Sequence, residues 1–163
     1  MRNVSGDFTA SLLVLTCLIP TILSTEVLQC KSKNFDLENS VNVTNCDKPP
    51  CVLKRKNTYT VNLKFSPDHD IKNVRTSVQG IIAGIPLPFL GVDGTSACGK
   101  IYDKDGKTPV KCPLEKGVQY TYINKFDILQ VYPKVRVVVH WALVDQATNK
   151  DITCFEVNAR IVS

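Results

Sequence analysis

Strict alternation of apolar and polar residues along short segments is the feature that most limits how this chain can fold. In Thr58–Phe65 every second residue is Tyr, Val, Leu or Phe, and the residues between them are Thr, Asn and Lys. The same period of two runs through Val135–Leu143 and Cys154–Val162. Because successive side chains of a β-strand point to opposite faces of its sheet, these segments are predicted to be half-buried strands.

Weaker versions of the same pattern predict four more strands. These candidates are Phe35–Thr44, Val52–Leu53, Val74–Ile82 and Gln119–Phe126. No stretch shows the 3.6-residue period of an amphipathic helix. Short strands joined by turns rich in Asp, Asn, Gly and Pro predict an all-β chain, an immunoglobulin-like two-sheet antiparallel β-sandwich of about seven strands. The 163 residues suffice for one such domain.

The first 24 residues are expected to lie outside this domain. Arg2 precedes an apolar run from Leu12 to Leu23, and the small residues Ser24 and Thr25 follow. This order is typical of a secretory signal peptide, and the run is shorter than the roughly 20 apolar residues of a membrane span. We therefore predict a signal peptide at residues 1–24 and a mature domain at residues 25–163. The mature protein is expected to be secreted, with the lysosomal lumen as the alternative compartment.

The cysteines agree with an oxidising compartment. Removal of residues 1–24 takes Cys17 away and leaves six of the seven cysteines, an even number that is typical of a disulfide framework. Six cysteines allow fifteen pairings, and the sequence alone selects none of them. Closeness in the chain favours Cys46 with Cys51 and Cys98 with Cys112, which leaves Cys30 and Cys154 near the two ends of the mature chain.

Residues that could carry catalysis or hold a metal are few. His69 stands in the polar turn Pro67–Asp70, and His140 takes an outward-facing position of its strand. The run Asp103–Gly106 begins like a calcium-binding loop, but its twelfth position is Leu114 instead of Glu. Zinc-ligand spacings and nucleophile motifs are absent from the sequence. We therefore expect no enzyme, no metal site and no cofactor. The net charge of +5 is dispersed, which argues against nucleic-acid binding.

The segment Gly80–Gly91 is unusual for a loop because it is apolar. Pro86 and Pro88 exclude an ordinary central strand, and the side chains around them are Ile, Leu and Phe. An apolar loop is either buried or requires an apolar partner, so the segment is either core or the rim of an interior cavity. The same two interpretations, core packing or cavity wall, apply to the inner-facing aromatic residues Tyr59, Phe65, Tyr120, Tyr122, Tyr132 and Trp141.

An ordered set of motifs connects these features to a known family. Tyr59–Phe65 has the sequence YTVNLKF, Gly80–Phe89 has GIIAGIPLPF, Tyr120–Lys125 has YTYINK and Val137–Trp141 has VVVHW. With these motifs and six cysteines in register, the chain resembles the Niemann–Pick type C-two family of secreted lipid carriers, within the ML lipid-recognition domain superfamily. The likeness extends over essentially the whole mature chain, and the arthropod members are at least as similar to it as the vertebrate sterol carriers.

The resemblance implies a fold and a set of site residues. The implied fold is the immunoglobulin-like sandwich, with an apolar cavity between its sheets and the disulfides Cys30–Cys154, Cys46–Cys51 and Cys98–Cys112. Matching family positions one by one places Phe89, Ile128 and Tyr132 at the entrance of the cavity. The implied ligand-binding wall is Tyr59, Val61, Leu87, Val137, Val139 and Trp141, and Tyr122 from the aromatic set joins it. Asn42, in the sequon Asn42-Val43-Thr44, is a candidate glycosylation site.

These observations predict a secreted carrier that reversibly binds a fatty acid, a sterol or a related semiochemical. The expected partners are this small lipid and a membrane receptor or transporter that accepts it, and the carrier is expected to act as a monomer. Two other classes stay open at this stage. One is an innate-immune module that recognises microbial lipid, and the other is an enzyme that acts on lipids.

Overall fold

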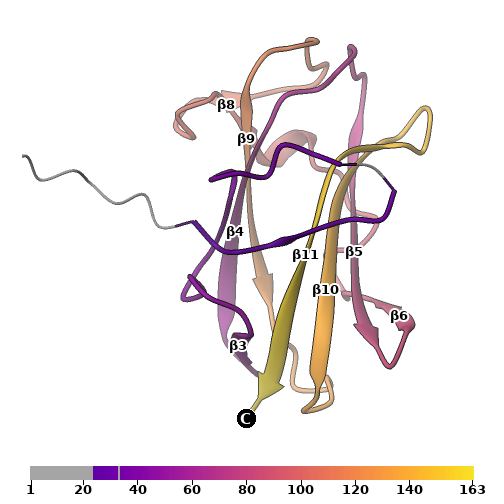
Figure 1. The fold of residues 1–163 in the computed structure, drawn as a ribbon. Helices are drawn as coiled ribbons and strands as arrows, with labels where there is room; N and C mark the ends of the chain where they lie inside the picture. Colours follow the sequence, from indigo (N-terminus) through magenta and orange to yellow (C-terminus); the bar gives the residue numbers. More distant parts are fainter. Residues whose placement is uncertain (1–23, 33) are drawn as a thin grey trace, which may run out of the picture.

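The alternating segments form two β-sheets that pack face to face, as the ribbon of the computed structural model shows (Figure 1). The structure describes residues 24–32 and 34–163, so the predicted signal peptide lies outside the described residues except for Ser24. Sheet A has the strand order β1-β11-β10-β5-β6, with β3 also beside β11. Sheet B has the order β2-β4-β9-β7-β8.

The strand bounds agree with the predicted segments to within about three residues, except for Phe35–Thr44. Sheet A consists of β1 (Leu28–Gln29), β3 (Cys51–Lys54), β5 (Val74–Ile82), β6 (Ile85–Pro88), β10 (Arg136–Asp145) and β11 (Asp151–Val162). Sheet B consists of β2 (Val41–Val43), β4 (Thr58–Phe65), β7 (Ile101–Tyr102), β8 (Pro109–Val110) and β9 (Tyr120–Asp127). One turn of 3₁₀ helix, η1, covers Cys98–Lys100. Among the described residues, no helix has the length and apolar character to cross a bilayer.

All seven predicted strands exist, and the two sheets confirm the sandwich. The segment predicted as Phe35–Thr44 is shortened to β2, because Ser40 donates a backbone hydrogen bond back to Leu37 in a turn and Asn39 adopts a positive φ of 53°. The remaining strands, β1, β6, β7 and β8, are two to four residues long. The ladders are antiparallel except for β3, which runs parallel to β11.

The period of two sets which side chains meet between the sheets. Along β4 the inward residues Tyr59, Val61, Leu63 and Phe65 are at most 6 % exposed, and the residues between them are exposed or half-buried. The inward residues of β10 and β11 are buried in the same way. These rows form the core that joins sheet A to sheet B.

Strand β6 explains how a proline-containing segment can belong to a sheet. It pairs only with β5 and therefore lies at the edge of sheet A, where Pro86 and Pro88 interrupt no central ladder. A two-residue turn at Ala83 and Gly84, both with positive φ, joins β5 to β6, as in a type I′ hairpin. Pairing with β5 holds the apolar side chains of β6 at the edge of the sandwich.

Three disulfides cross-link the chain, with the pairing that the resemblance implies. Cys30 is bonded to Cys154 on β11, and the bridge links positions 124 residues apart. The other bridges, Cys46–Cys51 and Cys98–Cys112, close loops with sequence separations of 5 and 14. In the chain-entropy account, the long loop gives the first bridge the largest stabilisation, roughly 4–5 kcal/mol.

Candidate ligand site between the sheets

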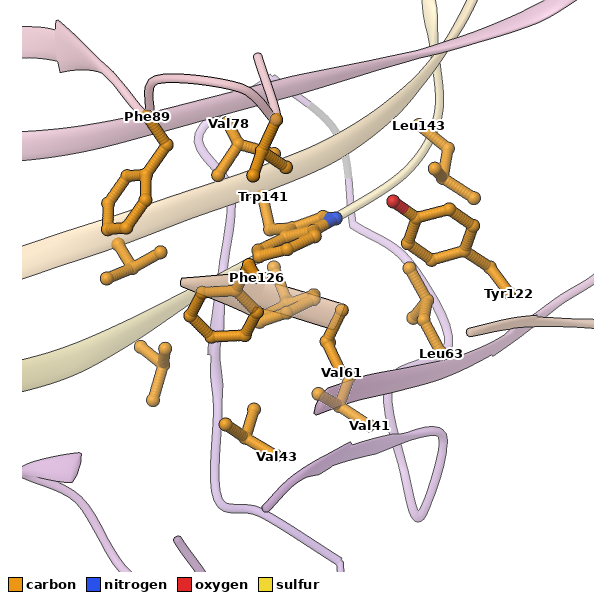
Figure 2. Close-up of a cluster of buried hydrophobic side chains, with 14 of the residues drawn as sticks. Val41, Val43, Val61, Leu63, Val78, Phe89, Tyr122, Phe126, Trp141 and Leu143 are labelled. Carbon is orange, nitrogen blue, oxygen red and sulfur yellow. The ribbon is translucent and has the colours of Figure 1, made fainter. Parts of the chain in front are cut away.

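An unbroken series of aromatic contacts leads from the protein surface into the interior. Tyr132, half-buried in the loop between β9 and β10, packs on Phe89 with ring centroids 5.3 Å apart. Phe89 contacts Phe126 at 6.3 Å, and Phe126 contacts Trp141 at 5.2 Å. Figure 2 shows Phe89, Phe126 and Trp141 following one another between the two sheets. We call this series, continued to Tyr122 at 6.4 Å from Trp141, the aromatic path.

The outer end of the aromatic path is closed by two loops. The Tyr132 hydroxyl accepts a hydrogen bond from the Leu90 backbone amide at 2.9 Å. Of the three residues predicted at the entrance, Phe89 and Tyr132 contact each other, with Phe89 4 % exposed and Tyr132 the more exposed of the two, and Ile128 is fully buried. Ile128 is held through its backbone by the neighbouring turn, because its amide donates to Asn57 and its carbonyl accepts from Lys56. We call Phe89, Ile128 and Tyr132 the gate residues.

Apolar side chains of β6 and of the two loops that Tyr132 and Leu90 join are exposed to solvent. Ile85 and Leu87 of β6, Leu90 after it and Val131 beside Tyr132 are 48–75 % exposed. Beneath them a small cavity of about 50 Å³ is lined by Leu87, Phe89, Tyr132 and Val137, among others. Leu87 therefore lies at the rim and not on an interior wall.

The lack of a side chain at Gly80 on β5 allows the Phe89 ring to pack close to this strand. A Cβ atom at position 80 would be 3.1 Å from Val137 Cγ2 and 3.3 Å from Phe89 Cε2. These contacts are tighter than ordinary van der Waals separations, so a larger residue here would displace the ring. The glycine of the GIIAGIPLPF motif thus has a packing role at the gate.

The apolar space between the sheets is small. A cavity of about 20 Å³ lies among Val61, Phe126, Val139, Trp141 and Phe155, with other apolar residues around it. That volume holds about one water molecule, whereas pockets for small ligands usually measure about 300–1,000 Å³. Binding of a lipid here therefore requires that the side chains along the aromatic path move apart.

The structure brings most of the predicted site residues together. Val61, Val139 and Trp141 line the interior cavity, and Val137 lines the rim cavity with Phe89 and Tyr132. Tyr59 also faces inward and packs on Phe126 at 6.0 Å, while its hydroxyl bonds to the backbone of Val52 and Lys54.

Two aromatic residues of the interior were not among the predicted site residues. Phe126 stands in the inward phase of β9 and Phe155 in that of β11, where Phe155 stacks on Trp141 with an interplanar angle of 4°. Their strand phase is the sequence signal that could have identified both.

The interior also contains a small group of polar atoms. The Tyr122 hydroxyl, the Asn124 amide nitrogen and the Trp141 indole nitrogen are all buried. Burial raises the pKa of the Tyr122 hydroxyl, and weak hydrogen bonds with the side chains of Asn124 and Trp141 act in the opposite direction. Asn124 was not predicted as a site residue.

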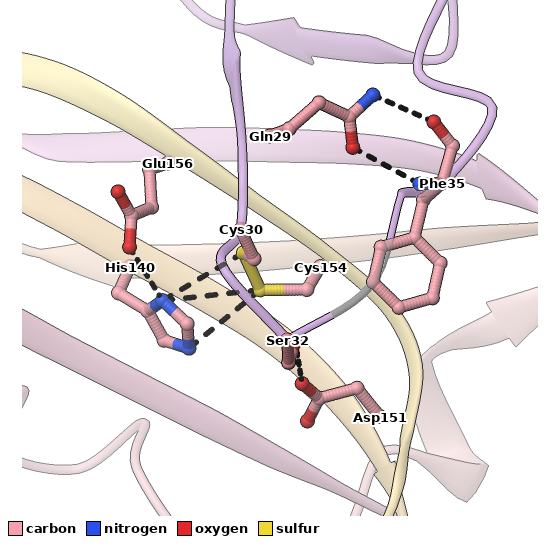
Figure 3. The surroundings of a disulfide bond; sticks show 8 residues. All are labelled: Gln29, Cys30, Ser32, Phe35, His140, Asp151, Cys154 and Glu156. Carbon is pink, nitrogen blue, oxygen red and sulfur yellow. Dashed lines mark hydrogen bonds and ion pairs between the residues drawn. A yellow bond between two sulfur atoms is a disulfide. The ribbon is translucent and has the colours of Figure 1, made fainter.

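The two histidines lie outside this interior. His140 covers the Cys30–Cys154 bridge, with Nδ1 3.7 Å from Cys30 Sγ and 3.1 Å from Glu156 Oε1 (Figure 3). The three side chains Cys30, His140 and Cys154 converge as metal ligands would, but the two sulfur atoms are bonded to each other and are not thiolates.

His69, in contrast, lies in an exposed turn beside acidic side chains. Its Nδ1 is 2.6 Å from Asp68 Oδ1 and its Nε2 is 3.5 Å from Asp145 Oδ2. The hydrogen bond to Asp68 is the main cause that raises the pKa of His69. Asn42, the candidate glycosylation site, lies on the edge strand β2 between the inward residues Val41 and Val43.

Comparison with known proteins places this fold and these motifs in a family. The sequence profile of the family described as ML domain matches residues 24–161. The chain is 36 % identical over 118 residues to NPC intracellular cholesterol transporter 2 of Bos taurus, a match that covers 72 % of each protein. It is 36 % identical over 138 residues to NPC intracellular cholesterol transporter 2 homolog a of Drosophila melanogaster, covering 83 % of this chain and 86 % of that protein.

A solved structure of similar fold agrees with these matches. The crystal structure of a Niemann–Pick type C2 protein from the Japanese carpenter ant superposes with a TM-score of 0.63 at 27 % identity, covering 75 % of this chain and 89 % of that one. The resemblance inferred from the motifs is thereby confirmed, insect relatives included. The chain belongs to the ML-domain family.

Proposed function

We propose that this protein is a secreted carrier that binds one small apolar lipid between its two sheets and releases it reversibly. The ligand is a fatty acid, a sterol or a related semiochemical. The observation that carries the proposal is the aromatic path, which leads from half-buried Tyr132 through Phe89 and Phe126 to Trp141. Three disulfides suit the oxidising compartment in which such a carrier acts.

The energy for binding comes from removing the lipid from water. An acyl chain of about 16 methylenes gains roughly 0.8 kcal/mol for each one buried, or about 13 kcal/mol in total. Immobilising the ligand, ordering its chain and opening the packed interior offset a large part of this gain. A net binding free energy near −8 kcal/mol, which corresponds to micromolar affinity, is the expected result.

Selectivity between apolar ligands is expected to be loose. An apolar wall distinguishes ligands by shape, and one methylene more or less changes the binding free energy by only about 1–3 kcal/mol. The interior is closed when no ligand is bound, so its side chains must repack around any ligand that enters. This repacking adds to the tolerance for ligands of different shape. A rigid sterol loses less conformational entropy on binding than a flexible acyl chain does, so it can compete with the acyl chain for the same site.

The experiment that tests the proposal identifies bound lipid and then measures competition. Mass spectrometry of the solvent extract from the native secreted protein reports what the protein carries. Cholesterol and oleic acid then compete for a fluorescent apolar probe. Sterol in the extract with no competition by oleate supports a sterol carrier, and fatty acids with strong competition by oleate support a broader carrier.

Two gate variants connect binding to the proposed entrance. Phe89→Leu keeps an apolar side chain at a buried position, and Tyr132→Ala removes a half-exposed ring. Both are expected to weaken lipid binding, whereas Val118→Ala, a truncation at an exposed position before β9, serves as the matched control. Failure of every lipid to displace the probe, or equal affinity in folded gate variants and control, contradicts the proposal.

A further inference from the structure

A histidine covers the disulfide bridge between Cys30 and Cys154. His140 lies on β10 beside β11, and its ring faces both sulfur atoms (Figure 3). Its Nδ1 is 3.7 Å from Cys30 Sγ, and its Nε2 is 3.6 Å from Cys154 Sγ. Within residues 24–32 and 34–163, these three side chains are the one group of Cys, His, Asp or Glu whose ligand atoms converge as those of a metal site do.

Glu156 orients this histidine. It stands directly across from His140 in the ladder of β10 and β11, and its Oε1 is 3.1 Å from His140 Nδ1. A proton on Nδ1 is donated to this carboxylate, so the lone pair of Nε2 stays free, 3.6 Å from Cys154 Sγ. Metal-bound histidines are held in the same way, with one ring nitrogen on the metal and the other donating to a carboxylate. His140 is therefore already oriented as a metal ligand.

The separations between these atoms fit tetrahedral zinc. Zinc binds cysteine sulfur at about 2.3 Å and histidine nitrogen at about 2.0–2.1 Å, so a sulfur and a nitrogen on one tetrahedral ion stand about 3.6 Å apart. His140 Nε2 and Cys154 Sγ have this separation in the oxidised protein. Two sulfur ligands stand about 3.8 Å apart, so the Cys30–Cys154 bond must open before an ion can enter. The side chains of His140 and Glu156 are 22 % and 19 % exposed, which gives the ion access from solvent.

We propose that reduction of the Cys30–Cys154 bridge creates a zinc site, in which Cys30 Sγ, Cys154 Sγ and His140 Nε2 bind the ion and Glu156 positions the histidine. Water takes the fourth place. Thiolate sulfur and imidazole nitrogen are the ligands that favour zinc over the hard cations calcium and magnesium, and two thiolates balance the charge of the ion. The inference goes beyond the proposed carrier function and is independent of it.

The bridge opens by exchange with a dithiol reductant. A thiolate of the reductant attacks Cys30 Sγ, the Cys30–Cys154 bond breaks, and Cys154 leaves as a thiolate beside His140. The second thiolate of the reductant then displaces Cys30 as a thiolate. The dithiol is oxidised by two electrons to a disulfide, and its two protons pass to solvent when zinc holds both cysteines. Cys30 is the accessible end, because it follows β1, a strand of two exposed residues at the edge of sheet A.

Cobalt(II) titration of the reduced protein tests the site, because cobalt substitutes for zinc and its absorption reports the ligands. The full mature protein is reduced with a phosphine and freed of it without oxygen, and alkylation with mass spectrometry identifies the free thiols. We expect one cobalt ion per molecule, with thiolate-to-cobalt absorption and the visible bands of tetrahedral cobalt, both lost when zinc is added. The oxidised protein is expected to show neither.

Variants assign the ligands. His140→Gln is expected to lower the zinc affinity of the reduced protein at least about 100-fold, and Glu156→Gln about ten-fold, because a ligand contributes more than the residue that orients it. His69→Gln removes the other histidine of the chain and is the matched control, with wild-type affinity. Cys30→Ser/Cys154→Ser keeps the other two bridges as a source of thiols and should lose the cobalt bands.

Three results would overturn the proposal. The first is a reduced wild type that binds no cobalt, and the second is equal zinc affinity in His140→Gln and His69→Gln. The third is persistence of the cobalt bands in Cys30→Ser/Cys154→Ser, which would place the metal on other cysteines. Where reduction unfolds the chain, zinc must restore the far-ultraviolet circular dichroism of the wild type and fail to restore that of His140→Gln, since an ion that binds the folded form stabilises it. Restoration of both, or of neither, also contradicts the site.

Discussion

The hydroxyl of Tyr132 accepts a hydrogen bond from the backbone amide of Leu90 at 2.9 Å, and this bond joins the loop after β6 to the loop between β9 and β10. The Tyr132 ring also packs edge-on against Phe89. A ligand that passes between these loops must break the hydrogen bond or tilt the ring. Opening of the gate therefore involves one polar contact and one apolar contact of the same side chain.

Tyr132→Phe separates these two contacts, because it removes the hydroxyl and keeps the ring. The lost hydrogen bond is worth about 1 kcal/mol, and the exposed Leu90 amide can bond to water instead. We expect the equilibrium affinity for lipid to change little and the dissociation rate to rise up to about five-fold. Stopped-flow dilution of the bound fluorescent probe measures the rate.

The control for this prediction is Tyr102→Phe, on β7 in sheet B. Its dissociation rate should match the wild type. A rate for Tyr132→Phe that is equal to the control would mean that ring packing alone closes the gate.

Gly80→Ala tests whether close packing of Phe89 sets the width of the entrance. The new methyl group would be 3.1 Å from Val137 and 3.3 Å from Phe89, so both side chains must shift by a few tenths of an ångström. We expect a loss of about 1–2 kcal/mol in the free energy of unfolding, measured by urea denaturation, together with altered lipid affinity. Gly99→Ala is the matched control, because a Cβ there meets no atom within 4 Å. Equal stability of the two variants contradicts the packing role.

Alternation predicted the long strands well because burial on one face imposes a period of two. It failed for Phe35–Thr44, where Asn39 leaves the extended conformation and only β2 remains. Strands of two residues, such as β7 and β8, are too short to show any period. The parallel pairing of β3 with β11 depends on how the chain runs between these two strands. The local pattern of apolar and polar residues carries no information on that path.

Site residues could be predicted from the sequence where they occupy the inward-facing positions of an alternating strand. Val61, Val139 and Trp141 could be identified in this way, and Phe126 could have been. Leu87 could not be placed, since β6 is an edge strand whose four residues are all exposed. Asn124 is a polar residue in an inward position, and its burial appears only when both sheets are in place.

Tyr122→Phe is expected to maintain or raise the stability of the unliganded protein. The Tyr122 hydroxyl is buried, and its contacts with Asn124 and Trp141 lack the geometry of strong hydrogen bonds, so its removal relieves a desolvation cost of roughly 1 kcal/mol. Tyr120→Phe should do the opposite and lose about 1 kcal/mol, since the Tyr120 hydroxyl accepts from the Glu115 amide. Urea denaturation of the two variants without lipid measures both effects. A clear loss of stability in Tyr122→Phe would show that its hydroxyl is already satisfied, by water or by a neighbour.

Acid should weaken the turn between β10 and β11 through Asp145. Its Oδ2 accepts from the Thr148 hydroxyl at 2.7 Å and its Oδ1 accepts from the Ala147 amide at 3.0 Å. The Thr148 bond first, then the Ala147 bond, lower the pKa of Asp145. A carboxyl group whose folded pKa lies below its unfolded value, about 3.9, stabilises the fold above that pH and loses the contribution as the pH falls toward the folded pKa.

Thr148→Val tests this assignment, because it removes the largest cause of the lowered pKa and keeps the side-chain shape. The variant should be less stable than the wild type near neutral pH, and the difference should shrink as the pH falls from about 4. Urea denaturation of both proteins over this range, with Asp145→Asn as the variant that cannot titrate, measures the difference. A gap between wild type and Thr148→Val that stays constant down to about pH 2 would mean that the hydroxyl stabilises the turn independently of the charge on Asp145.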